Sequence, residues 1–305
     1  MRDSLQSRSD KLCPQLIRAV GSHQATHGWS FFIGGFDLSS HAFDQAIALE
    51  LQSDGSFAGH TSPAYANMVG PYGGISAAQM VNAVLLHPDR LGDPVSLTIN
   101  FAAALEPGPF VVQARAARTN RSTQHWMLEV LQQGVTVLTG TAFTALRRET
   151  WGVDEDAMPQ CPPPQETPHG QGPMPMEWLK QYDMRPIAGA IPLVWDGSGD
   201  TSLTQLWVRD NPPRPLDYAS LTALSDVFFP RIFVRRATLV PVGTVTMTVY
   251  YHADSAQLQA SGSSYLLAQA RAQAFRNGYF DHTAQLWNEA GVLLATTHQV
   301  VYYKN

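Results

Sequence analysis

One carboxylate in this sequence stands where a carboxylate is costly. Asp226 lies in the apolar stretch Leu216–Phe229, which the pattern predicts to be a helix ending at Pro230. An ionised side chain in such a stretch loses hydration unless it meets water or a polar partner. Asp226 therefore either lies on the solvent side of the helix or caps a loop, or it faces a cleft that contains water. In the second case its carboxylate could accept a proton from that water, which is general-base chemistry.

Motifs for other catalytic chemistries are absent from this sequence. It contains no G-x-S-x-G serine elbow, no P-loop and no G-x-G-x-x-G loop for a dinucleotide. His23 and His27 have i, i+4 spacing but no third ligand, so we expect no metal site. His252 and His298 are expected to be packed or surface histidines. The sequence therefore predicts no cofactor.

Composition and charge exclude several other classes of function. The 305 residues are 44% hydrophobic and only 15% charged, so a large core can form and disorder is not expected. The formal net charge is −5 and the longest basic runs are pairs, which excludes nucleic-acid binding as the main role. We see no signal peptide, no membrane-spanning run and no cysteine framework, and we expect a cytoplasmic protein without a membrane partner.

The hydrophobic pattern predicts two similar series of elements separated by a proline-rich linker at 152–175. In the first series a strand and an Asp54-Gly55 turn precede a buried helix, and a long antiparallel sheet follows. The predicted helix is 75–86 and the predicted strands are 46–51, 95–103, 110–118, 124–131 and 135–146. In the second series the predicted helices are 176–182 and 216–229, and the predicted strands are 187–194, 204–209, 242–251, 265–274, 283–287 and 292–303.

The two series match each other in sequence. Tyr72–Ala78 aligns with Tyr218–Leu224, and Val95–Phe101 aligns with Val245–Tyr251, with the order of elements kept. An internal repeat of this kind implies two copies of one supersecondary unit. Each copy would have a long apolar helix and a twisted antiparallel sheet wrapped around it. Joining the two sheets edge to edge would cover their exposed edges.

Several stretches of this repeat resemble the acyl-CoA thioesterase II family and the broader thioesterase-like double hot-dog proteins, over about residues 43–304. They are Gly70–Gly74, Arg118–Ser122 with Val130–Gln132, Leu216–Asp226, Thr244–His252 and Ala295–Gln299. Asn120 stands where that family usually has glycine. The resemblance implies an α+β double hot-dog fold, with two repeats of a long central helix wrapped by an antiparallel sheet. The expected organisation is an N-terminal extension at 1–40, hot-dog domains at 41–151 and 176–305, and the linker between them.

The same resemblance implies a catalytic set of Asp226, Thr244 and Gln299. In the family the helix aspartate activates water, and a threonine and a glutamine on neighbouring strands hold that water. Thr246 lies two residues beyond Thr244, so a small slip of the alignment would exchange them. Gln299 could instead be an outward-facing strand residue. Direct attack by the Asp226 carboxylate, through an anhydride, stays open.

The internal repeat supports this set, because the first copy lacks it. Opposite the three residues stand side chains that cannot handle protons, namely Met80, Ala142 and Pro94. We therefore expect one site per chain, built mainly by the second half.

Substrate-binding groups are predicted from residue type. Backbone N–H groups at a helix start stabilise an oxyanion, and the candidates are Gly73 with Gly74, and Ser220 with the residue before it. Gly73 and Gly74 could also form a plain turn. Arg121 could meet CoA phosphates, as could Arg118, Arg271 and Arg276, although each could be a solvated strand-end charge. The large aromatic residues could line an acyl tunnel or fill the core: Trp126, Trp207, Trp287, Phe228 and Phe229.

These observations predict hydrolysis of an acyl-CoA, or of an acyl-carrier thioester, to free acid and thiol. One alternative is a non-catalytic protein that binds acyl thioesters. Another is an enoyl-thioester hydratase, which needs an Asp/His pair a few residues apart, whereas the first histidine after Asp226 is His252. We expect a role in lipid metabolism and assembly as a homo-oligomer.

Overall fold

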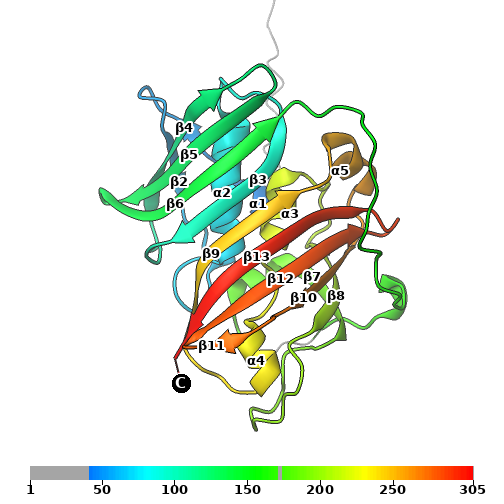
Figure 1. The fold of residues 1–305 in the computed structure, drawn as a ribbon. Helices are drawn as coiled ribbons and strands as arrows, with labels where there is room; N and C mark the ends of the chain where they lie inside the picture. The colour runs from blue at the N-terminus through cyan, green and yellow to red at the C-terminus, as the bar shows by residue number, and fades with distance from the viewer. Residues whose placement is uncertain (1–40, 171–173, 305) are drawn as a thin grey trace, which may run out of the picture. The chain divides into compact units, whose positions relative to one another are not determined.

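The computed structural model describes residues 41–170 and 174–304, so the predicted N-terminal extension lies outside the described residues. In the described part, thirteen strands form one antiparallel sheet in the order β1-β2-β4-β5-β6-β3-β9-β13-β12-β10-β8-β7, with β11 paired to β12 (Figure 1). The strands are β1 (Glu50–Leu51), β2 (Phe57–His60), β3 (Asp93–Phe101), β4 (Pro109–Thr119), β5 (Thr123–Gln132), β6 (Val135–Ala145), β7 (Tyr182–Ala188), β8 (Thr204–Asp210), β9 (Val242–Tyr251), β10 (Leu266–Arg271), β11 (Phe275–Arg276), β12 (Tyr279–Asn288) and β13 (Leu293–Tyr303).

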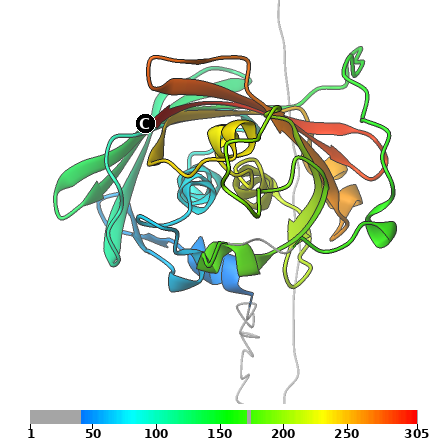
Figure 2. The same cartoon turned by 90° about the horizontal axis from the view of Figure 1, so that it is seen from below.

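Two central helices fill the concave side of this sheet. Helices α2 (Gly73–Leu86) and α3 (Tyr218–Leu224) lie side by side with the curved sheet around them (Figure 2). Most side chains of α2 are buried, and many are small, which lets the helices approach closely. The remaining helices are α1 (Ala42–Ala46), α4 (Arg231–Arg236) and α5 (Ser255–Ser261), with short 3-10 turns at Pro63–Tyr65, Pro164–Glu166 and Glu177–Gln181. One helix and one half of the sheet per repeat confirm the predicted α+β double hot-dog fold.

The two halves of the sheet meet at β3 and β9, and we call this pairing the seam. Thr98 is the Cα partner of Thr248, and their Oγ1 atoms lie 3.0 Å apart. The sequence repeat aligns these same two threonines. The partners on either side are Ser96–Tyr250 and Asn100–Thr246. Each strand of the seam therefore pairs with its own repeat counterpart, related by a local two-fold axis at the two threonines.

The second central helix differs from its prediction. The apolar stretch Leu216–Phe229 does not form one helix, because α3 ends at Leu224 and α4 starts only after Pro230. The Ser225 hydroxyl donates to the carbonyl of Leu221, and such back-bonding competes with regular helix geometry. The missed helix α5 does carry a sequence signal, since Asp254 and Gln257 form a capping box. Two predicted strands are only partly formed: of 46–51, the strand β1 covers Glu50–Leu51 alone, and 187–194 is irregular beyond Ala188.

The proline-rich linker covers the convex side of the second half of the sheet. The indole N–H of Trp207 donates to the carbonyl of Pro162 at 2.9 Å, and that of Trp287 donates to the carbonyl of Asp156 at 3.2 Å. Trp207 and Trp287 form a separate buried cluster with Tyr265 and Leu267. These two tryptophans therefore lie on the opposite face of the sheet from the helices and do not line a tunnel beside Asp226.

Candidate active site

Asp226 and Gln299 are brought together from two elements far apart in the sequence. The Gln299 side chain projects from β13 toward the helices and is only 4% exposed. Its Nε2 donates to Asp226 Oδ1 at 2.7 Å. Asp226 itself lies just after the C-terminal end of α3, and part of its surface stays accessible to solvent. The pair thus combines a carboxylate that water can reach with a fixed amide donor.

The surroundings of Asp226 raise its pKa. Desolvation is the dominant cause and raises the pKa to about 7, while hydrogen bonds from Gln299 and from the backbone N–H of Gly74 partly offset it. A carboxyl group with a pKa near neutrality can both accept and return a proton at physiological pH. The cause of the raised pKa is burial beside neutral donors rather than a neighbouring anion.

The N-terminal end of α2 faces the same carboxylate. A β-carbon on Gly73 would lie 2.8 Å from Asp226 Oδ2, and one on Gly74 would lie 2.6 Å from the carbonyl oxygen of Ala223 and 2.5 Å from the ring of Tyr72. Glycine at both positions lets α2 approach α3 and the carboxylate. The backbone N–H of Gly74, predicted from the sequence as an oxyanion donor, acts on Asp226 here and contributes to lowering the pKa of that carboxyl group. The first half of the chain therefore contributes directly to the site.

Thr244 lies on the same face of the sheet as Gln299. A β-bulge at Val245 makes Thr244 the Cα partner of Val301, a buried residue two positions beyond Gln299. Without that extra residue, the alternation along β9 would direct Thr244 to the convex face. Among the described contacts, its hydroxyl makes no direct hydrogen bond to Asp226 or Gln299.

Two other predicted residues are not brought to this site. Thr246 pairs with Asn100 and Val300 on the convex face, and its hydroxyl donates to the carbonyl of Ile99 at 3.0 Å. Arg121 is exposed in the turn between β4 and β5. From the convex face Thr246 cannot reach a group bound at Asp226, which corrects the binding role expected for it. The contact expected between Arg121 and CoA phosphates stays a prediction.

The donor groups at the N-terminal end of α3 are also engaged in contacts within the protein. The backbone N–H of Ser220 donates to Asp217 Oδ1 at 2.8 Å, and its hydroxyl donates to Asp210 Oδ2 at 2.5 Å. Both donors of Ser220 are therefore used within the protein, which corrects its expected role as an oxyanion donor. Burial raises the pKa of Asp210 to about 6, with the Ser220 hydroxyl opposing the rise.

Sequence reasoning missed one polar residue beside the pair. His282 on β12 is the Cα partner of Gln299 and is 2% exposed. The pattern of β12 contains a signal for it, since Phe280, His282 and Ala284 alternate on the buried face. An inward-facing histidine in such a strand could have been identified from that alternation. Its proximity to Gln299 depends on strand order and register, which the sequence pattern alone does not provide.

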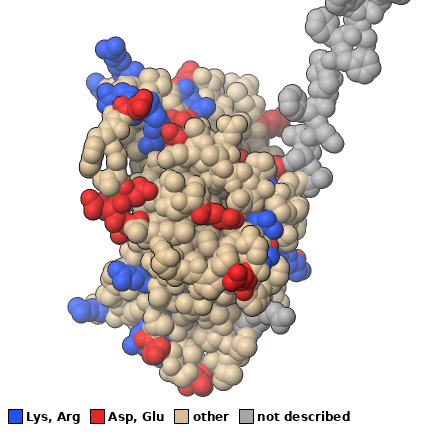
Figure 3. Space-filling view, turned by 90° about the vertical axis from the view of Figure 1, so that its right-hand side faces the viewer, with Lys and Arg blue, Asp and Glu red and all other residues tan. Residues whose placement is uncertain are grey.

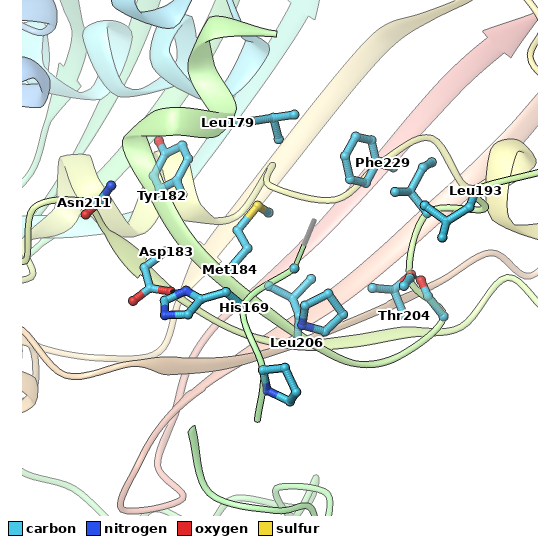
Figure 4. A pocket seen from close by; sticks show the side chains of 16 residues that line it. His169, Leu179, Tyr182, Asp183, Met184, Leu193, Thr204, Leu206, Asn211 and Phe229 are labelled. Atoms are coloured by element: carbon cyan, nitrogen blue, oxygen red, sulfur yellow. Dashed lines mark hydrogen bonds and ion pairs between the residues drawn. The ribbon is translucent and has the colours of Figure 1, made fainter. Parts of the chain in front are cut away.

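A groove of about 440 Å³ opens near the site on the concave side of β7 and β8 (Figure 4). Its apolar walls come from the strands, from the loop after β7 and from the segment between α3 and α4. Polar groups lie along one side, where His169 and Asp183 are 2.9 Å apart. The apolar lining residues are Leu179, Met184, Ile191, Leu193, Leu206 and Phe229. A groove of this size and lining suits a small apolar ligand.

An aromatic cluster lies between this groove and Asp226, which does not itself line the groove. Tyr182 and Phe229 line the groove, and both contact Trp178, with ring centroids 6.1 and 6.3 Å apart. Trp178 stacks on Tyr72 at 4.3 Å, directly before Gly73. Burial is the main cause of the raised pKa of Tyr182, and the charge of Asp226 adds to the rise. The cluster thus forms a continuous aromatic wall from the groove to the carboxylate.

The described surface offers little for other ligands. On the face drawn in Figure 3, Lys and Arg side chains are scattered among Asp and Glu rather than gathered in one basic area. No group of three or more metal-ligating side chains lies together within the described residues. Each described helix is too short or too polar to cross a lipid bilayer.

Comparison with known families and structures identifies relatives over most of the chain. Models of the acyl-CoA thioesterase N-terminal and C-terminal domains match residues 62–145 and 157–303. A conserved protein of unknown function with a hot dog fold from Alicyclobacillus acidocaldarius is 47% identical, covers 87% of this chain and 99% of its own, and has a TM-score of 0.83. No curated protein matches the sequence.

Two more distant structures share the fold. A putative thioesterase II from Thermobifida fusca YX is 20% identical, with 86% of this chain and 97% of that chain covered and a TM-score of 0.72. An acyl-CoA thioesterase II from Mycobacterium marinum is 19% identical, with 86% and 98% covered and a TM-score of 0.69.

Proposed function

Because this chain belongs to the acyl-CoA thioesterase family and is a thioester hydrolase, we propose that it cleaves an acyl-CoA to the free acid and CoA with Asp226 as general base. The observation that carries this proposal is the hydrogen-bonded Asp226–Gln299 pair. A carboxyl group with a pKa of about 7, fixed by an amide donor and partly open to solvent, is suited to deprotonating water. The expected setting is the cytoplasm, with the chain assembled as a homo-oligomer.

The proposed reaction begins with a water molecule hydrogen-bonded to Asp226. The carboxylate takes one proton as the water oxygen forms a bond to the thioester carbonyl carbon. The carbon–sulfur bond then breaks, the electron pair leaves with sulfur, and the proton returns from Asp226 to give the free thiol. Gln299 keeps the carboxylate in place, and Thr244 orients the water from the same face of the sheet. The positive end of the α2 dipole favours the negative charge that develops on the carbonyl oxygen.

We assign the distal part of the acyl chain to the groove beside β7 and β8. Its lining is mainly apolar, and its inner wall ends on Tyr182 and Phe229 next to the site. Phe229 lies only three residues beyond Asp226, so the segment that positions the base also forms one wall of the groove. An acyl chain entering from the thioester would pass the aromatic cluster to reach this space.

Thiol release from a panel of acyl-CoAs, from acetyl to palmitoyl with branched and aromatic members, tests the proposed function. Wild-type protein should release CoA, and Asp226→Asn should lower turnover by at least about 100-fold, as expected for loss of a general base. Acyl-CoA binding, measured by calorimetry, should persist in that variant. Unchanged turnover in Asp226→Asn would show that the base is misassigned. No release by folded wild-type protein would favour a non-catalytic binding protein.

A further inference from the structure

Two buried polar side chains next to Gln299 have no hydrogen-bond partner in the described structure. They are His282, at Nε2, and Thr297, at Oγ1. His282 is the Cα partner of Gln299 across β12 and β13, and Thr297 precedes Gln299 by two residues on the same strand face. Their exposed fractions are 2% and 0%. Side chains opposite each other on one face of an antiparallel pair have Cβ atoms about 5 Å apart, so both residues flank the Gln299 amide.

The other copy of the repeat shows that these polar groups are not required by the fold. There Trp126 is the Cα partner of Ala142, as His282 is of Gln299. Ala142 is the residue that the sequence repeat places opposite Gln299, and Gly140 precedes it where Thr297 precedes Gln299. The first copy thus has an indole, a methyl group and a hydrogen at the three positions. Buried unpaired polar groups cost stability, and at these three positions only the copy that carries Asp226 has them.

The imidazole of His282 is held in its neutral form. Burial, the charge of Arg231 and a smaller effect of His298 lower its pKa well below the usual value. Arg231 is itself fully buried and donates to the carbonyls of Phe229 and Ser202. The ring of Phe228 packs edge-on against the imidazole, with centroids 5.3 Å apart. His282 is therefore wedged between Gln299 and the segment that carries Asp226.

A neutral imidazole has one N–H group that can donate a hydrogen bond. The oxygen of the Gln299 amide can accept such a bond. The Gln299 amide can flip by half a turn, which would exchange its nitrogen and its oxygen. An ionised carboxylate only accepts hydrogen bonds, so the flipped amide would place its oxygen against Asp226 and lose the contact. A donor on the Gln299 oxygen would fix the amide in the useful orientation.

We propose that His282 is a positioning residue for thioester hydrolysis, which donates to the Gln299 amide oxygen and thereby keeps the amide N–H on Asp226. This inference rests on the proposed role of Asp226 and Gln299. His282 acts through Gln299 and does not touch the substrate. Thr297 is the second polar neighbour of the same amide and supports its orientation from the adjacent position on β13.

If His282 holds Gln299 in place, its loss should change the pH dependence of turnover. The hydrogen bond from Gln299 lowers the pKa of Asp226. A loosely held Gln299 should let that pKa rise, so the acidic limb of the rate profile should move to higher pH. A residue that only packs in the core would lower stability without moving this limb. The charged group near His282 is Arg231, whose pKa burial lowers to about 9, and His298 is the other titratable neighbour.

The test uses the variants His282→Phe, Gln299→Ala and the double variant, with His298→Phe as the matched control. His298 adjoins Gln299 on the exposed face of β13. His282→Phe should lower kcat by about tenfold, the effect expected for one lost hydrogen bond, with KM little changed and the acidic limb moved up. His282→Gln, which keeps a donor, should restore most of kcat. The double variant should be no slower than Gln299→Ala.

The inference would be overturned if the losses of kcat in the two single variants multiplied in the double variant. It would also be overturned if the acidic limb of the pH–rate profile of His282→Phe stayed where it is in the wild type. His282→Leu replaces His282→Phe if thermal melts show that the phenylalanine variant does not fold, and the same outcomes apply. The panel also separates this inference from the proposed function. If Gln299→Ala and Asp226→Asn leave turnover unchanged, the proposed function fails. If both variants lower turnover but the effects of His282→Phe and Gln299→Ala are independent of each other, this inference alone fails.

Discussion

Gly73 lies so close to Asp226 that a β-carbon on it would be 2.8 Å from the carboxylate Oδ2. The obstructing atom is the end of a side chain and not backbone, so Gly73→Ala should fold while pushing the carboxylate from its place. We expect kcat/KM to fall by at least about tenfold, because a misplaced base loses its alignment with water. Thiol-release kinetics and a thermal melt on the same sample measure the two effects.

Gly152→Ala is the matched control for that prediction, because a β-carbon there meets no atom within 4 Å. It should leave both activity and melting temperature unchanged. Gly74→Ala should behave differently from Gly73→Ala, since its β-carbon would meet the backbone oxygen of Ala223 at 2.6 Å. Equal activity of Gly73→Ala and wild type would show that the close approach to Asp226 is not used in catalysis.

The raised pKa of Asp226 predicts a pH dependence of turnover. The carboxyl group is protonated below its pKa of about 7 and cannot accept a proton there. The kcat/KM value should therefore rise with pH through about 7 and level off above it. Initial rates with one acyl-CoA between pH 5 and pH 9 give this profile. If kcat/KM instead rose near the ordinary aspartate pKa of about 4, the idea that burial raises the pKa of the base would be contradicted.

The same shift predicts a pH-dependent effect on stability. In the unfolded chain Asp226 ionises near its ordinary pKa of 3.8, whereas in the fold it does so at about 7. The folded state therefore binds the proton more tightly, and this stabilisation is complete below about pH 4 and is lost as pH rises through 7. Asp226→Asn cannot ionise, so its free energy of unfolding relative to wild type should increase from pH 5 to pH 8, by on the order of 2 kcal/mol. Denaturant titrations at the two pH values measure the difference, and a constant difference would contradict the prediction.

The groove assignment predicts a change in chain-length preference. Leu206 is a lining residue and is 5% exposed. Leu206→Trp would fill part of the 440 Å³ and should lower kcat/KM for long acyl-CoAs by about tenfold or more, with acetyl-CoA or butyryl-CoA turnover kept. Measuring the whole panel with both proteins gives the internal control. A uniform loss at all lengths would place the acyl chain elsewhere.

The elements that the sequence predicted well are those whose signal is local. Helix α2 begins two residues before its predicted start and ends at the predicted residue, because His87 and Pro88 stop an all-apolar run. The strands around the seam were predicted to within a few residues from their alternation. The apolar pattern gave no sign that α3 ends at Leu224, because the break serves a contact between Asp226 and α2 that is tertiary.

The site residues were harder to predict from local sequence patterns than the fold was. Asp226 stood out by type, but its partner Gln299 was found through the family resemblance, since 73 positions separate them. The inward orientation of Thr244 depends on a bulge, which spacing does not reveal. His282 was missed because its importance depends on register with Gln299. Residues whose role is set by strand pairing need the three-dimensional arrangement before chemistry can be assigned.

The seam has a consequence for how this enzyme could be divided. Asp226 and Gln299 come from the second repeat, whereas the glycine turn that faces them comes from the first. A chain cut in the proline-rich linker would yield two fragments, and neither would hold the carboxylate and its helix N-terminus together. The fragments would meet again through the main-chain ladder centred on Thr98 and Thr248. The two halves of the chain are thus joined both by the linker and by the seam, and the proposed site needs both of them.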